Sequence, residues 1–283
     1  MITWILNRLV DRATRFAARF ASDDSDPKLI ALKRKGVAAL RQNTAAFHEF
    51  SQRLFLAEDI DGVPMPLVDV SDKHTISWLH RNWLRGHTLV PGRRPLVIDL
   101  GANDGLIGSM SLNFVQLGWD AVLVEPLPDM MALTRSNLGA YRRDGQTLVF
   151  VESAVGPIDG EMHFEAEVAG DLSQMEGRLV AAATPTSRPV PVISADSLLA
   201  HAEVSALLRQ AGPVVLSVDI EGQDAVVTGR LLELGLRPDV IIVEVVHVGD
   251  DVSAVPFDSY GYRKAAHIGW NDIYLLDRNT GAP

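Results

Sequence analysis

The chain of 283 residues contains no cysteine. This absence excludes disulfides, thiolate zinc sites, iron–sulfur clusters and cysteine nucleophiles. No run of about 18 apolar residues occurs either, so no membrane-spanning helix is expected. The first apolar stretch, Trp4-Ile5-Leu6, is too short for a signal peptide because Asn7 and Arg8 follow it. We therefore expect a soluble, cytoplasmic protein.

Basic residues are also scarce relative to acidic ones. Lys and Arg number 26 against 36 Asp and Glu, which gives a formal net charge of -10. An acidic surface repels phosphate backbones, so we expect no nucleic-acid partner unless a local basic patch exists. Hydrophobic residues make up 47% of the chain, which is enough for a sizeable core.

The first third of the chain reads as mostly helical. Across residues 2–20, apolar side chains recur every three or four positions and arginines occupy the opposite face. Such a helix could pack on its own domain, pack on a second subunit, lie on a membrane surface or serve as a transit peptide. Helical patterns follow at residues 28–57 and 72–86, whereas two prolines predict extended backbone at Val63–Leu67.

From Leu96 onward, short apolar runs alternate with longer helical patterns, which is typical of a parallel sheet covered on both faces. We therefore divide the chain into an N-terminal helical cap or oligomerisation region, residues 1–90, and an α/β domain, residues 91–283. The strand candidates are Leu96–Leu100, Ala121–Val124, Thr147–Val151, Val214–Val218, Val240–Val245 and Asn271–Leu276, and the helix candidates are residues 106–117, 127–140, 195–210 and 223–235.

The first of these strands runs into a small-residue loop, Val97–Gly105, before a helix. Glycine lets the backbone approach a ligand closely, and a helix start offers free N–H groups. Asp99 at the strand end could accept hydrogen bonds from an ammonium group. The loop is not a dinucleotide fingerprint, because Asn103 and Leu106 stand where the second and third glycines would be required.

Glu125 ends the second strand, about 20 residues after the glycine loop, where an acidic residue can bind the two hydroxyls of a ribose. Together, Asp99, Gly101 and Glu125 suit a ligand with an amine at one end and a ribose in its middle. S-adenosylmethionine has both groups and carries no phosphate. The plain alternative is a structural glycine turn and a surface glutamate.

At this point the sequence resembles the FkbM-type methyltransferases, a branch of the class I S-adenosylmethionine-dependent enzymes, over residues 95–277. The block Leu216–Asp224 is the most specific part, although Ser217 stands where the family usually has Lys and Asp224 where it usually has Glu. The other matching stretches are Val97–Gly105, Leu123–Pro126, Val151–Gly156, Ile193–Leu198, Tyr260–Tyr262 and Asn271–Tyr274.

The resemblance implies a doubly wound, mostly parallel seven-stranded sheet of the Rossmann-like kind and S-adenosylmethionine as cofactor. It also implies methyl transfer to a hydroxyl of a small molecule, polyketide or saccharide. In addition to Asp99 and Glu125, the residues expected to bind the cofactor are Gly101, Asn103, Asp104, Glu152, Ser153, Ala154 and Asp219, of which Glu152, Ser153 and Ala154 would line the adenine.

Acidic residues and one histidine follow two neighbouring strands of the predicted sheet. Asp219 and Glu221 leave one strand, and Glu244 and His247 leave the next. The carboxyl ends of parallel strands meet at one edge, so these groups should converge there. We expect Asp219 at the methionine end or acceptor side, and Glu221 and His247 as candidate general bases.

Each catalytic candidate has a plainer interpretation. Glu221 could be a salt-bridged structural acid and His247 an ordinary loop histidine. The carboxylates could instead hold a divalent cation, although we predict no metal. Two other functions stay open: an NAD-type oxidoreductase and a non-catalytic S-adenosylmethionine-binding subunit. Formation of a homo-oligomer and peripheral membrane contact through residues 2–20 stay open as well.

Overall fold

The computed structural model describes residues 59–60, 63–64, 75–84, 92–106, 109–166, 177–185, 187–245 and 251–278. The predicted helices at residues 2–20 and 28–57, and the candidate base His247, lie outside these ranges. Within them, no helix is both long enough and apolar enough to cross a bilayer.

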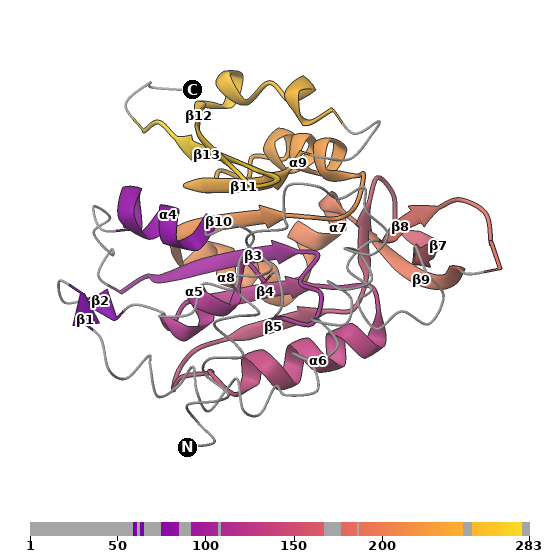
Figure 1. The fold of residues 1–283 in the computed structure, drawn as a ribbon, viewed down its shortest axis with the longest axis horizontal. Coiled ribbons are helices and arrows are strands. Elements are labelled where there is room, and N and C mark those ends of the chain that lie inside the picture. The colour runs from indigo at the N-terminus through magenta and orange to yellow at the C-terminus, as the bar shows by residue number, and fades with distance from the viewer. Residues whose placement is uncertain are drawn as a thin grey trace, which may run out of the picture.

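Seven strands form the main sheet, and β13 alone among them runs antiparallel to its neighbours β11 and β12 (Figure 1). Each of the six predicted strands is present, and β12 is the seventh. The mixed α/β class and the mostly parallel sheet are thereby confirmed. In sheet order the strands are β12 (Tyr262–Ile268), β13 (Asn271–Leu276), β11 (Val240–Glu244), β10 (Ala211–Val218), β3 (Arg94–Leu100), β4 (Asp120–Val124) and β5 (Leu148–Val151).

Alternate residues of the central strands enter two separate cores, one on each face of the sheet. In β3, for example, Leu96, Ile98 and Leu100 face one core and Val97 faces the other. The first core is covered by α7 (Ala195–Ala200), α8 (Ala202–Gln210), α9 (Asp224–Glu233), η3 (Val252–Ala254) and η4 (Phe257–Tyr260). The second is covered by α4 (Thr75–Asn82), α5 (Leu112–Gln116) and part of α6 (Pro128–Gly139).

Helix α4 lies within the predicted N-terminal region, yet its Ile76 and Leu79 pack into the second core. This part of the region therefore belongs to the sheet domain.

The bounds of two predicted helices need correction. Among the described residues of the segment 106–117, the helix begins at Leu112, because Ser109 Oγ accepts the N–H groups of Ser111 and Leu112. The segment 195–210 breaks at His201, whose ψ of 129° is extended.

A second, four-stranded sheet, which the sequence analysis did not predict, projects from the domain beyond the end of β5 (Figure 1). Its strands, in sheet order, are β6 (Ala154–Gly156), β9 (Ser187–Ser194), β7 (Gly160–Ala166) and β8 (Gly177–Val180). We call it the small sheet. A separate short hairpin pairs β1 (Asp59–Ile60) with β2 (Val63–Pro64), which agrees with extended backbone at that position.

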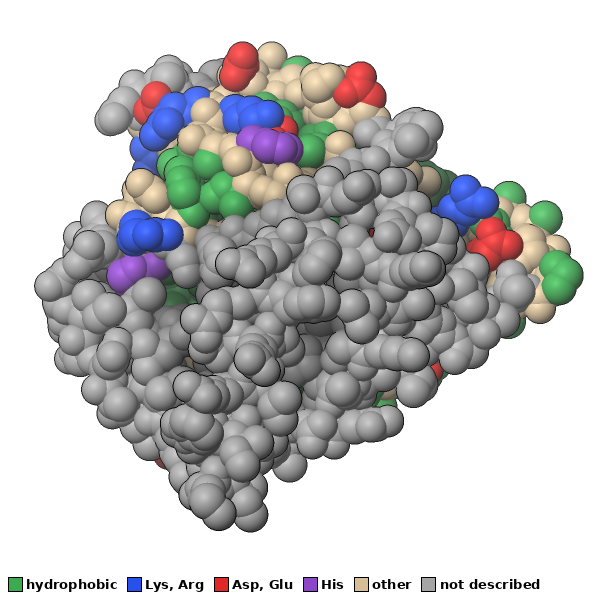
Figure 2. Space-filling model, in the orientation of Figure 1, with side chains coloured by type: hydrophobic (Ala, Val, Ile, Leu, Met, Phe, Trp, Pro, Cys, Tyr) green, Lys and Arg blue, Asp and Glu red, His purple; other side chains and the backbone are tan. Residues whose placement is uncertain are grey.

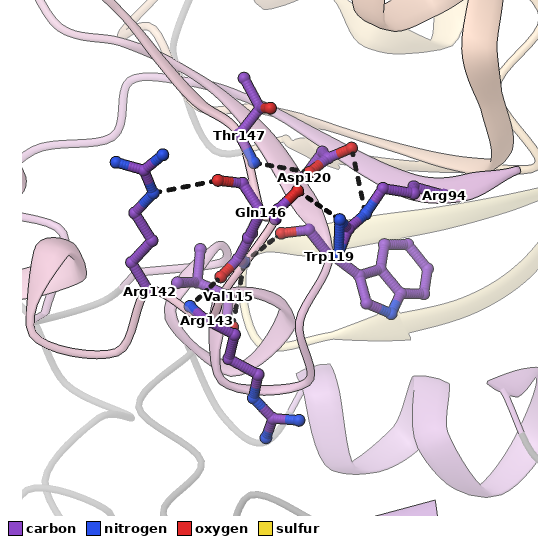
Figure 3. Close-up of polar contacts among 9 residues, drawn as sticks. Arg94, Val115, Trp119, Asp120, Arg142, Arg143, Gln146 and Thr147 are labelled. Carbon is purple, nitrogen blue, oxygen red and sulfur yellow. Dashed lines mark hydrogen bonds and ion pairs between the residues drawn. The ribbon is translucent and has the colours of Figure 1, made fainter.

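The amino-terminal edge of the main sheet is fixed by buried polar side chains (Figure 3). Gln146 is 1% exposed, its amide nitrogen donates to the carbonyls of Val115 and Trp119, and its amide oxygen accepts from Arg143 N at 2.9 Å. Asp120 accepts from Thr147 N at 2.7 Å. These contacts join the segment that precedes β4 to the segment that precedes β5. They hold the amino-terminal end of β4 in place.

Lysine, arginine and histidine side chains gather at the top of Figure 2, where β12 and β13 lie in Figure 1. One buried carboxylate contacts two of these side chains. Asp272, which is 6% exposed, lies 2.6 Å from Lys264 Nζ and 2.7 Å from His267 Nδ1. The three residues tie β12 to β13.

Candidate functional site

A pocket opens at the carboxyl-terminal edge of the main sheet, where the strand order reverses. From β3 the chain moves outward through β4 to β5, and it later returns to place β10 on the other side of β3. Ligands of open α/β sheets bind at such a reversal. The pocket encloses about 790 Å³ of atom-free space, including its open mouth. Its walls come from the ends of β3, β4, β5 and β10 and from the small sheet.

Gly101 forms the floor of the pocket where β3 and β10 end side by side. Its φ is +93°, and a Cβ at this position would collide with the carbonyl oxygen of Asp219 and lie 2.9 Å from the carbonyl carbon. Hydrogen bonds fix the approach: Asp219 N donates to Leu100 O at 3.0 Å, and Gly101 N donates to Val124 O at 2.9 Å. Only glycine fits here without moving a strand end.

Glu125 lies in the wall next to this floor and is 5% exposed. Its Oε2 accepts from Asn103 N at 3.0 Å and its Oε1 accepts from Leu127 N at 2.9 Å. Burial raises the pKa of Glu125 to about 7, although these hydrogen bonds oppose the shift. Each carboxylate oxygen keeps a further lone pair, so the side chain could accept two hydroxyl groups from a ligand.

Of five other predicted cofactor residues, three line the pocket and two do not. Asp104 is fully buried and accepts from Leu106 N at 2.9 Å, so it shapes the loop and does not line the pocket. Glu152 is exposed and does not line the pocket either. Asn103 does line it, with φ +47°, and its Oδ1 accepts from Asp104 N. Ser153 and Ala154 line the pocket as well.

Asp99 lies one layer behind the pocket. It is 2% exposed, is hydrogen-bonded by Ser111 and Ser217, and has no hydrogen-bond partner at Oδ2. Desolvation raises its pKa to about 6. Ser109 lines the pocket, and its Oγ lies 3.2 Å from Ser111 Oγ. Hydroxyl groups therefore connect Asp99 to the ligand space.

A group of three carboxylates, Asp219, Glu221 and Glu244, occupies one end of the site, with one oxygen of each within 4.8 Å of the others. Asp219 and Glu221 line the pocket. Burial, together with the negative charges of Glu244 and Glu221, raises the pKa of Asp219 well above its ordinary value. The predicted convergence of these side chains is thus observed. Chemically, the group can retain a proton, bind a cationic ligand group or hold a divalent cation.

Glu221 is held in its position by Asp224, a residue to which the sequence analysis gave no role. Glu221 has φ +60°, which is uncommon for a residue other than glycine. The fully buried Asp224 carboxylate accepts from Ile220 N at 2.9 Å and from Gly222 N at 3.1 Å. These bonds bracket Glu221 and direct the turn after β10 toward Asp219.

The sequence analysis also missed the side of the pocket that the small sheet supplies. Phe164, Gly177 and Leu179 line it, together with Val155. The only signal in the sequence was the alternation of Met162 and Phe164, which predicts at most a half-buried strand.

No family model matches the chain, and no curated protein matches it. Three solved chains match, among them a hypothetical protein of Thermus thermophilus. It shares 16% sequence identity, and the match covers 72% of this chain and 83% of that chain with a TM-score of 0.37. A likeness of this degree supports no argument about fold or function.

The contact at Gly101 predicts an unequal response to two alanine substitutions. Gly101→Ala and Gly235→Ala impose the same left-handed strain, since the φ values are +93° and +91°, but nothing lies within 4 Å of a Cβ at Gly235. We expect Gly235→Ala to cost about 1 kcal/mol and Gly101→Ala at least about 3 kcal/mol. Urea denaturation measures both, and equal losses would contradict the close approach.

Asp99 predicts a pH dependence of stability. Its folded pKa of about 6 exceeds the ordinary 3.8, so the folded state binds the proton more tightly. Stability from this group is present below about pH 4 and is lost as the pH rises through 6, on the order of 3 kcal/mol. The neutral variant Asp99→Asn should therefore gain stability relative to wild type between pH 4.5 and pH 7.5. Urea titrations at several pH values test this, with the exposed Glu152→Gln as control, and parallel profiles for wild type and Asp99→Asn would refute it.

Proposed function

We propose that this protein is an S-adenosylmethionine-dependent methyltransferase of the FkbM type, acting on a hydroxyl of a small molecule, polyketide or saccharide. The observation that carries the proposal is the composition of one pocket at the sheet reversal. It combines a floor that only glycine can form, a buried carboxylate with free lone pairs and a group of acids at one end.

The groups around the pocket match a nucleoside with a cationic tail. Glu125 offers both carboxylate oxygens to the ribose hydroxyls, with Asn103 N and Leu127 N holding it in place. Asp219 packs its backbone carbonyl against Gly101 and lines the pocket, where its carboxylate could accept hydrogen bonds from an α-ammonium group. A cation placed there would offset the repulsion among the three carboxylates. The positive charge of the ligand thus complements the negative charge of the site.

The same contacts disfavour an NAD-type oxidoreductase. The loop N–H of Asn103, which a pyrophosphate would need, is already bonded to Glu125. Negative side chains surround the pocket, where a dinucleotide would bring two phosphates. The sheet agrees with the dinucleotide-binding order over five strands, but antiparallel β13 then occupies the sixth position.

For the chemistry, the bound cofactor supplies an electrophilic methyl group on sulfur. The protein's part is to align an acceptor hydroxyl with it and to remove the hydroxyl proton. Glu221 is the candidate base, because it lines the pocket and Asp224 fixes its backbone. Asp219 lies beside it, at the end of the pocket proposed for the cationic tail. The second proposed base, His247, lies outside the described residues.

Calorimetry with S-adenosylhomocysteine tests the binding half of the proposal. Wild type should bind, and Glu125→Gln should bind at least about 10-fold more weakly, because hydrogen bonds to an ionised carboxylate are lost. Affinity for the wild type should also fall as the pH drops below about 7, where Glu125 takes up a proton. Glu152→Gln is the matched control, since Glu152 is exposed beyond the pocket. If wild-type protein with a cooperative unfolding transition fails to bind, the proposal is wrong.

Formation of S-adenosylhomocysteine with a panel of hydroxylated saccharides and polyketides tests the catalytic half. We expect turnover with at least one class, and Glu221→Gln should lower kcat about 100-fold or more, a larger factor than its effect on cofactor affinity. Glu233→Gln, on the exposed end of α9, serves as control. Binding without turnover of any class would favour the non-catalytic subunit instead.

A further inference from the structure

The pocket has two unlike ends, and the small sheet forms one of them. The three carboxylates lie at the ends of β10 and β11. Phe164 lies on β7 and Leu179 on β8 of the small sheet. The first strand of this sheet, β6, begins three residues after β5 ends. Because β10, β3, β4 and β5 are successive neighbours, the carboxyl ends of β10 and β5 are three strand spacings apart, roughly 14 Å.

The small sheet presents a continuous apolar face toward the domain. Val190 and Val192 of β9 are buried with Leu127 and Met130 at the start of α6, and Phe164 packs against this group. Buried positions alternate with more exposed ones along β9 from Pro189 to Ser194, as expected for a sheet with one buried face. The pocket-lining side chains of the small sheet are therefore part of a packed surface.

Hydrogen bonds and an ion pair fasten the small sheet to the main domain. Ser153 Oγ donates to Pro191 O at 3.0 Å, and Arg188 lies 2.8 Å from Asp129 of α6. At its other end, Asp159 accepts from Ser194 N and from Ser197 Oγ, each at 2.6 Å. Phe164 is thus presented to the pocket from a fixed frame.

Gly177 determines where the Phe164 ring lies. A Cβ at Gly177 would collide with Cε1 of the ring and come within 2.5 Å of Cζ, so the ring edge rests directly on the glycine backbone. Phe164 remains half-buried and lines the pocket beside Val155 and Leu179. One side of the pocket is therefore an aromatic ring seated by a glycine, next to the apolar side chains of Val155 and Leu179.

From this arrangement we propose that Phe164 stacks on the purine ring of the bound nucleoside and that Gly177 sets the ring position at which stacking occurs. The inference rests on the proposed function and extends it to a part of the chain outside the motifs of the resemblance. An aromatic face favours any planar base, whereas the carboxylates at the far end select the charged tail. The two ends thus divide recognition between them.

Calorimetry with two ligands tests the inference: S-adenosylhomocysteine, and 5′-methylthioadenosine, which lacks the amino-acid tail. Phe164→Ala should lower the affinity for both ligands by the same factor, roughly 10-fold, which is within the range for loss of one base–aromatic stack. Phe164→Leu keeps an apolar side chain and should recover part of the loss. Gly177→Ala should also lower the affinity for both ligands, because the added Cβ must displace the Phe164 ring. Met162→Ala, on the same face but not lining the pocket, is the control.

The outcomes separate this inference from the proposal beneath it. If wild type binds neither ligand, the proposed function fails and the inference with it. If wild type binds and Phe164→Ala binds equally well, only the stacking is refuted. If Phe164→Ala weakens S-adenosylhomocysteine but not 5′-methylthioadenosine, the ring contacts the tail, and the assignment of the purine is wrong. Thermal unfolding of each variant shows that the small sheet is still folded.

Discussion

The close approach of two strand ends, where Gly101 lies against the carbonyl of Asp219, is the constraint on which the pocket depends. It brings a residue that follows β3 and one that follows β10 into contact, although they are separated by more than a hundred residues of chain. The hydrogen bond from Asp219 N to Leu100 O repeats the same alignment one residue earlier. A larger side chain at Gly101 would separate the acidic end of the site from the Glu125 wall.

The pKa values of the acidic residues in the site are set by burial more than by contacts with opposite charges. Asp99, Glu125 and Asp219 all have raised pKa values, and desolvation is the first cause in each case. In a protein of net charge -10, nothing in the described lining of the pocket is cationic. The site is therefore complementary to a ligand that donates hydrogen bonds and carries positive charge, and it is unfavourable for phosphate.

The sequence predicted those features that depend on residues close together in the chain, and it missed those that depend on how distant segments pack. Buried parallel strands are continuous apolar runs, so the central strands were found within a few residues, and Glu125, Asp219 and Glu221 followed from strand-end placement. The small sheet was missed because Pro189 and Pro191 argue against a central strand, yet β9 pairs on both sides. Both prolines occupy exposed positions of its alternation, so the buried face is undisturbed. The role of Asp224 could not be predicted, since it depends on the path of the turn that its carboxylate bonds.

Two departures from the FkbM-type pattern acquire physical meaning from their surroundings. Ser217, where that pattern usually has Lys, is 1% exposed and hydrogen-bonds to Asp99 on the adjacent strand. Desolvation by burial raises the pKa of Asp99 to about 6, and the hydrogen bond from the Ser217 hydroxyl opposes this rise only in part. Asp224, where the pattern usually has Glu, has the shorter side chain, which fits a carboxylate that bonds N–H groups two and four residues before it. The acid behind the pocket is therefore raised in pKa by its burial, whereas the turn that carries Glu221 is fixed by two hydrogen bonds to a buried carboxylate.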